Sequence, residues 1–141
     1  MLCDCHAYAT LPARDLARAR QFYEKVLGFE PRAVTSAGVI YDALGSRFLL
    51  YPTQFAGTNT ATYMAFEVAD ARKMAAELRS RGVRFEEYDL PGFKTTDGIV
   101  DTPDGPGAWF KDTEGNILAL FQPVQAMECT PAFNQGGGRD R

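Results

Sequence analysis

The order of the predicted elements occurs twice along the chain, and this internal repeat restricts the fold more than any other feature of the sequence. Residues 6–12 (HAYATLP) predict a strand, and the apolar spacing that follows predicts an amphipathic helix from Asp15 to Gly28. Three strand-like runs come next, near residues 31–35, 39–43 and 48–51. A second strand (TYMAFEVA) and a second helix (DARKMAAELRSRGV) repeat this order, and the helix-ending Gly82 lies 54 residues after Gly28.

The second repeat continues with a strand-like run (VRFEEYDL), a loop over residues 91–107, and two strands (AWFKD and NILALFQ) joined at DTEG. A four-stranded unit with one helix is not easily stabilised alone, so two units are expected to pair around a common core. We therefore predict an α+β fold with paired βαβββ modules, about residues 6–52 and 61–123, in one domain of residues 1–123. Residues 124–141 are expected to form an irregular or disordered tail.

Composition limits the classes of partner. The chain has 141 residues, a net charge of −3 and no cluster of Lys or Arg, which argues against nucleic acid and anionic membranes as partners. No apolar run approaches the roughly 18 residues that span a bilayer, and the first residues lack a signal-peptide pattern, so we expect a cytoplasmic protein. Three cysteines at irregular spacing suit a reducing compartment. A small-molecule ligand and protein partners remain.

Three segments in this order resemble the vicinal oxygen chelate superfamily, which includes glyoxalase I, the bleomycin resistance proteins and the extradiol dioxygenases. They are LPARDLARARQFYEKVLGFEP, FEVADARKMAAELRSRGVRF and AWFKDTEGNILALFQ. The resemblance implies that the sheets of the two modules form a partial barrel around a central cleft, commonly in a homodimer. It also implies that catalytic members hold a divalent metal through His or Glu from four strands.

The four positions that match those metal ligands hold other residue types here. They are Tyr8, Leu50, Tyr63 and Ala119. A neutral phenol is a poor ligand for divalent metals, and the side chains of Leu and Ala have no donor atom. We therefore predict a metal-free protein without a cofactor.

The run CDCH near the N-terminus is the one local pattern that suggests a metal. His6 and Tyr8 share a face of the predicted strand, whereas Cys3 and Cys5 point to the opposite face, so a straight strand cannot offer all three to one ion. The only nearby carboxylate partner proposed for His6 is Glu67, and this pairing stays open. The other interpretation is a rim or surface histidine beside two thiols that behave as small apolar residues.

Aromatic residues provide the main functional signal. In the fold that the resemblance implies, several of them line or cap the cleft, and flat rings with a few hydroxyls suit an organic ligand. The loop at residues 90–107 would lie at the cleft mouth and offer Lys94 among its polar contacts. The expected ligand-binding set is Tyr8, Phe48, Leu50, Tyr63, Phe93, Trp109 and Ala119.

These observations are consistent with three functions. The first is metal-free binding or sequestration of a small aromatic or amphipathic molecule in the central cleft of a homodimer, as the resemblance to bleomycin resistance proteins implies. The second is a lyase, isomerase or dioxygenase-like enzyme, either with unconventional metal ligands or with Tyr63, Tyr8 and Glu67 as candidate acids and bases. The third is an interaction module whose cleft is filled by side chains.

Overall fold

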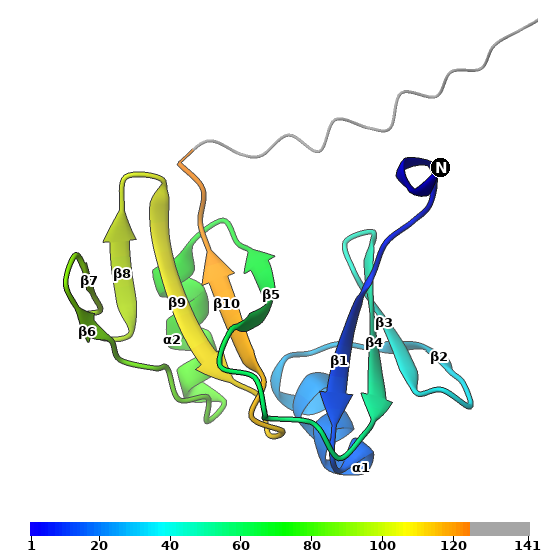
Figure 1. Ribbon diagram of the computed structural model, residues 1–141. Coiled ribbons are helices and arrows are strands. Elements are labelled where there is room, and N and C mark those ends of the chain that lie inside the picture. The colour runs from blue at the N-terminus through cyan, green and yellow to red at the C-terminus, as the bar shows by residue number, and fades with distance from the viewer. Residues whose placement is uncertain (125–141) are drawn as a thin grey trace, which may run out of the picture.

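Each half of the chain folds into a strand, a helix and three further strands, as the repeat predicts (Figure 1). The computed structural model describes residues 1–124. The first module contains β1 (Ala9–Ala13), α1 (Leu16–Gln21), β2 (Pro31–Val34), β3 (Val39–Ala43) and β4 (Ser46–Pro52). The second contains β5 (Thr62–Glu67), α2 (Ala71–Ser80), β8 (Ile99–Thr102), β9 (Gly105–Lys111) and β10 (Ile117–Phe121). The additional elements are η1 (Leu2–Asp4), the π-helical turn η2 (Phe22–Val26), β6 (Asp89–Leu90) and β7 (Phe93–Lys94).

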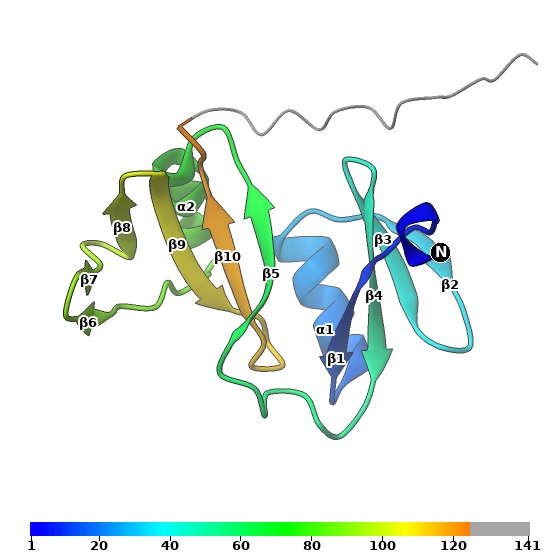
Figure 2. The ribbon, with the colours of Figure 1, turned by 45° about the horizontal axis from the view of Figure 1, so that its top comes forward.

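The two sheets have the same topology. Their strand orders are β1-β4-β3-β2 and β5-β10-β9-β8, and in each the first strand runs parallel to the last while the other pairs are antiparallel. The α+β class with paired βαβββ modules is therefore confirmed. The sheets formed by residues 1–124 do not close into a barrel (Figure 2).

Local sequence signals explain where both helices begin. Asp15 and Asp70 are the N-caps, and each side chain accepts a hydrogen bond from the backbone N–H three residues later. The first helix continues into the π-helical turn, where the N–H of Leu27 donates to the carbonyl of Phe22 at 3.0 Å. This wider turn directs both Phe22 and Tyr23 into buried positions, with 9% and 0% exposure.

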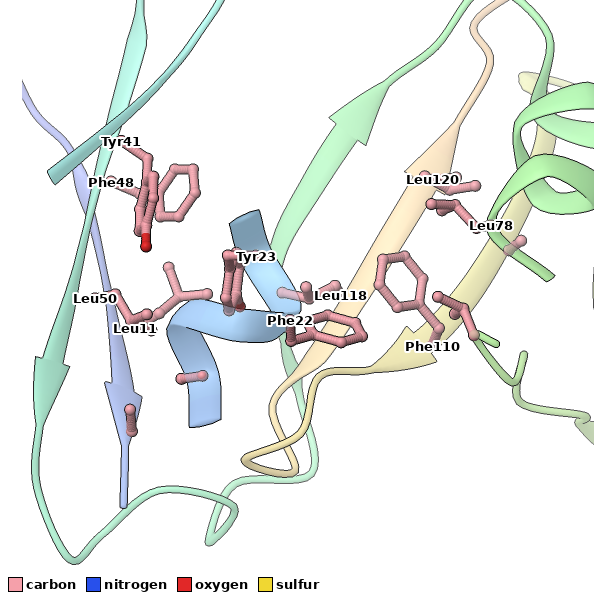
Figure 3. Packing of buried hydrophobic residues seen from close by; sticks show 14 of the residues in the cluster. Leu11, Phe22, Tyr23, Tyr41, Phe48, Leu50, Leu78, Phe110, Leu118 and Leu120 are labelled. Carbon is pink, nitrogen blue, oxygen red and sulfur yellow. The ribbon is translucent and has the colours of Figure 1, made fainter. Parts of the chain in front are cut away.

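One hydrophobic core lies between the helix-covered faces of the two sheets. Figure 3 shows α1 between them, with Tyr23 toward the first sheet and Phe22 toward Leu118 and Phe110 of the second. The rings of Phe29 and Phe66 join the two modules at 5.8 Å between centroids. The opposite faces, which we call the open faces, point away from this core, so the two open faces do not enclose a cleft within one chain.

The turn between β9 and β10, residues 112–116 (DTEGN), fastens the second module to the first. Asn116 is fully buried and donates through Nδ2 to the carbonyl of Pro12 at 2.8 Å. Glu114 accepts hydrogen bonds from the backbone N–H of Asp15 and from Nε of Arg18, both at 2.8 Å. These bonds hold the turn against the start of α1 and set the relative position of the sheets.

The segment after α2 differs from the prediction. Residues 83–90 form only the two-residue strand β6 and an isolated bridge between Phe85 and Phe110 in place of one continuous strand. Residues 91–107 are more regular than the expected loop, since they contain β7, β8 and the start of β9. Asp97 and Gly98 both have positive φ angles, 52° and 74°, and form a two-residue turn between Thr96 and Ile99. A further expectation, the irregular tail, falls on residues that lie outside the described part of the chain except for Val124. None of the helices described is long and apolar enough to cross a membrane.

Candidate ligand site

Trp109 lies half-buried on the open face of the second sheet, because its neighbours Ala108 and Phe110 point into the core. Its indole Nε1 donates to the hydroxyl of Thr62 at 3.2 Å. The far edge of the ring passes over Gly107, where an added Cβ would lie 3.2 Å from the Trp109 ring. The indole is therefore held at both ends along the sheet.

Two further rings contact this indole at steep angles. The ring of Phe93 lies 5.3 Å from that of Trp109 at an interplanar angle of 64°, and the ring of Tyr88 lies 6.0 Å away at 83°. The distance between the centroids of Tyr88 and Phe93 is 5.8 Å. We call these three residues the aromatic corner: the rings of Tyr88 and Phe93 are both steeply inclined to the indole, the edge-to-face geometry that aromatic pairs prefer.

The β6–β7 hairpin that carries the two inclined rings is anchored by Thr95. The Thr95 hydroxyl accepts from the N–H of Tyr88 at 2.7 Å, and the Thr95 N–H donates to the carbonyl of Tyr88 at 2.9 Å. The same hydroxyl donates to a carboxylate oxygen of Glu87. Because Thr95 is only 6% exposed, these bonds are shielded from water and hold the hairpin in place.

Tyr88 supplies the polar group of the aromatic corner. Burial, and to a lesser degree the negative charge of Glu86, raise the pKa of the Tyr88 phenol above its ordinary value. The phenol therefore stays protonated at neutral pH and can donate a hydrogen bond. Tyr88 is not among the site residues expected from the sequence, because its contact with Trp109 joins residues 21 positions apart.

Tyr8 lies on the other module, next to the first sheet. Its side chain is 58% exposed, just before β1, at a cavity of about 350 Å³ on the first module. Arg47 also lines this cavity, and its Nε donates to Asp42 at 3.3 Å. Within one chain, Tyr8 and Trp109 thus lie on open faces that point away from the shared core. The cavity is lined by His6, Ala7, Tyr8, Ile40, Gly45, Ser46 and Arg47.

Phe48 and Leu50 do not face a ligand cleft in this structure. Their exposures are 1% and 0%, and both belong to the hydrophobic core. The register pairs Leu50 with Leu11, which places the two side chains together on the helix-covered face. The expectation that these two residues line a cleft is corrected, and they are left out of the site proposed below.

Tyr63 and Glu67 are at opposite ends of β5. The register between β5 and β10 shifts where Thr62 pairs with Ile117 and Met64 with Leu118, so Tyr63 is the extra residue of a β-bulge. Its side chain is half-buried at the edge of the core, whereas Glu67 is exposed. Ala119 is the cross-strand partner of Trp109 and is 5% exposed.

The residues at the four positions implied for a metal do not fit one. Leu50 lies in the core on the face opposite Tyr8, and neither Leu50 nor Ala119 has a donor atom. Cys3 and Cys5 are exposed near the N-terminus, while Cys129 is outside the described residues. Within residues 1–124, no three side chains of His, Cys, Asp or Glu are grouped so as to hold a metal ion.

Comparison with known proteins agrees with this architecture. No curated protein matches the sequence. Among solved structures, an antibiotic-binding protein from a Streptomyces species matches with a TM-score of 0.58 and 25% identity, covering 84% of this chain and 95% of its own. A glyoxalase/bleomycin resistance protein/dioxygenase from Alicyclobacillus acidocaldarius matches with a TM-score of 0.63 and 17% identity, covering 86% and 93%.

A fosfomycin resistance protein from Listeria monocytogenes matches with a TM-score of 0.63 and 15% identity, covering 85% of this chain and 93% of its own. At these last two identities the likeness concerns the fold alone. A family model matches residues 6–120, which is most of the chain. The chain therefore belongs to the glyoxalase/bleomycin resistance protein/dioxygenase superfamily.

Proposed function

We propose that this protein binds a small, planar aromatic or amphipathic molecule on the aromatic corner and acts by sequestering or carrying it. The observation that carries the proposal is the arrangement of Trp109, Phe93 and Tyr88 on an open sheet face. A flat ligand would stack on the indole, meet the edge of the Phe93 ring and accept a hydrogen bond from the Tyr88 phenol. The similarity to an antibiotic-binding protein supports this class of function.

The complete site is proposed to need a second copy of the chain. Each open face carries aromatic surface, with Tyr8 next to the first sheet and Trp109 on the second, and the two faces point away from the shared core. A homodimer in which the first sheet of one copy covers the second sheet of the other would place Tyr8 of one copy opposite Trp109 of its partner. The ligand would then be enclosed between two aromatic surfaces and shielded from water.

Binding is proposed to proceed without a metal, because the residues at the implied ligand positions lack suitable donors. The test is metal analysis of protein purified without chelators, with sub-stoichiometric metal as the expected result. One equivalent of bound zinc, nickel, manganese or iron per chain would overturn the metal-free proposal.

The binding proposal is tested by titrating naphthalene and anthracene derivatives into the protein and following the fluorescence of Trp109, the only tryptophan. For the tightest compound, Phe93→Leu is expected to weaken binding about tenfold, since it removes one ring contact. The matched control is Phe55→Leu, because Phe55 is 65% exposed outside the corner. Equal affinities for both variants would contradict the proposed site.

Acid–base catalysis is the second candidate, because a β-bulge re-aims the side chain of Tyr63 and bulges are common beside active sites. This candidate requires turnover of a substrate with vicinal oxygen atoms. Tyr63→Phe would then lower kcat while leaving KM nearly unchanged. Turnover that survives this substitution would exclude Tyr63 as the acid or base.

A further inference from the structure

A second cavity, of about 550 Å³, lies between α2 and the segment that joins β7 to β8. It is distinct from the aromatic corner, because successive residues of β7 point to opposite sides: Phe93 contacts Trp109, and Lys94 lines this cavity. Figure 1 shows β6, β7 and β8 at the end of the second module farthest from the first, with α2 behind β9 and β10. The lining residues are Arg72, Arg79, Lys94, Thr96, Asp97, Ile99 and Asp101.

Arg79 is held in a fixed position at this cavity. Its guanidinium donates to the backbone carbonyl of Asp97, and its Cζ lies 5.0 Å from the centroid of the Phe85 ring. Gly98 packs so closely on this pair that an added Cβ would lie 2.7 Å from Phe85 Cβ. A guanidinium has five N–H donors, so the donors of Arg79 that do not bond to the turn remain for a ligand. Because the side chain is already held in place, it would lose little conformational entropy when a ligand binds.

The charges around the cavity favour an anion. Arg72 is paired with Asp101 through Nη2, at 2.9 and 2.7 Å from the two carboxylate oxygens. Arg79 is bonded to a neutral carbonyl, and no acidic side chain of residues 1–124 lies within 4.0 Å of the Lys94 ammonium. The lining thus holds three cations and two carboxylates, an excess of one positive charge on a chain whose net charge is −3.

The spacing along α2 leaves room for the ligand. Arg72 and Arg79 are seven residues apart, which puts them on the same side of the helix and about 10 Å apart along its axis. Ala76 lies between them on that side and projects only a methyl group. The floor beneath includes Ile99, which is 6% exposed.

We propose that this cavity binds the phosphate group of a small molecule, with Arg79, Lys94 and the hydroxyl of Thr96 as its donors. The oxygens of a phosphate accept hydrogen bonds. Arg79 offers a guanidinium held in one orientation, Lys94 offers an ammonium charge, and Thr96 offers a hydroxyl donor. The proposal does not depend on the aromatic corner and would stand if that site bound nothing.

The test is isothermal titration calorimetry with pyrophosphate as the probe, at constant ionic strength. Saturable binding is expected, and Lys94→Gln is expected to weaken it about tenfold, as the loss of a charge-assisted hydrogen bond predicts. Lys94 is exposed, so the variant should fold normally. The control is Lys73→Gln, which removes the same charge from α2 outside the cavity and should change the dissociation constant less than twofold.

Three results would overturn the proposal. They are the absence of saturable binding, an unchanged affinity in Lys94→Gln, and an equal loss in both variants, which would indicate general surface charge. A further arm replaces pyrophosphate with acetate at the same ionic strength. Acetate is expected to bind at least tenfold more weakly, and equal affinity would contradict the assignment to phosphate.

Discussion

The orientation of the Trp109 indole depends on Gly107, which has no side chain to push the ring away. At Gly107 the backbone φ is ordinary, so alanine is conformationally allowed, but its Cβ would lie 3.2 Å from the indole. Gly107→Ala should therefore shift the indole with a stability loss of no more than about 1 kcal/mol. The expected results are a changed Trp109 emission maximum and weaker aromatic binding. An unchanged spectrum together with unchanged affinity would mean that Gly107 does not position the ring.

Glu114 makes stability depend on pH. Burial alone would raise the pKa of Glu114, but hydrogen bonds from Arg18, the N–H of Asp15 and Thr113 outweigh it, and the pKa lies below the ordinary 4.5. A carboxyl whose pKa is lower in the folded state stabilises fully above its unfolded pKa, and this contribution disappears as pH falls through the folded pKa.

The free energy of unfolding should therefore fall as pH decreases below about 5, and Glu114→Gln should lose about 1–3 kcal/mol at pH 7 with a flatter acid dependence. Urea unfolding at pH 7 and at acid pH measures both. The control is Glu77→Gln, since Glu77 is half-exposed and pairs with Arg81 on the surface of α2. Parallel pH profiles of Glu114→Gln and wild type would contradict this assignment.

Residue-level prediction succeeds where the cause is local. Asp15 as a helix cap and Gly28 as a helix end depend on neighbours within a few residues, and both are found as predicted. The face that Leu50 presents depends instead on its pairing with Leu11, 39 positions earlier. Alternation along a single strand relates residues of that strand to one another but does not say which of its two faces the core covers.

At the scale of elements, the β6–β7 hairpin should depend on Thr95. Thr95→Val keeps the shape but leaves the N–H of Tyr88 without its acceptor, at a cost of about 1–2 kcal/mol. We expect faster amide hydrogen exchange at Tyr88 and weaker aromatic binding. The control is Thr96→Val, on the same segment but exposed. Equal exchange in the two variants would mean that Thr95 does not anchor the hairpin.

The β6–β7 hairpin also illustrates which elements can be predicted from the sequence: those long enough to carry a periodic pattern of apolar residues. Both amphipathic helices and the strands with regular apolar runs can be predicted, because their periodicity is contained within each segment. The strands β6 and β7 have two residues each, too short for any periodicity, and they are held by Thr95 and by ring contacts to Trp109. Their position therefore depends on the folded sheet beneath them.

For the whole molecule, the open faces are the basis of the dimer prediction. Sedimentation is expected to give a species of twice the 15.5 kDa chain mass, and Tyr8→Glu is expected to shift it toward monomer and to weaken aromatic binding. The control is Phe55→Glu, which adds the same charge on the linker between the modules. A wild-type monomer that binds the ligand fully would contradict the shared site.

Paired modules with one core could be predicted from the repeat, whereas the direction of the open faces could not. That direction is set by contacts such as Phe29 with Phe66 and Asn116 with Pro12, which join residues 37 and 104 positions apart. Such long-range contacts produce no periodic pattern in the sequence around either residue, so they cannot be predicted from it.

A crystal structure of the protein with its tightest aromatic ligand would show whether the aromatic corner is the binding site. We expect ligand density stacked on the indole of Trp109, with the edge of Phe93 beside it and the phenol of Tyr88 within hydrogen-bonding distance. Density elsewhere, for example in the apolar cavity of about 200 Å³ that Phe29 and Phe66 line, would contradict it.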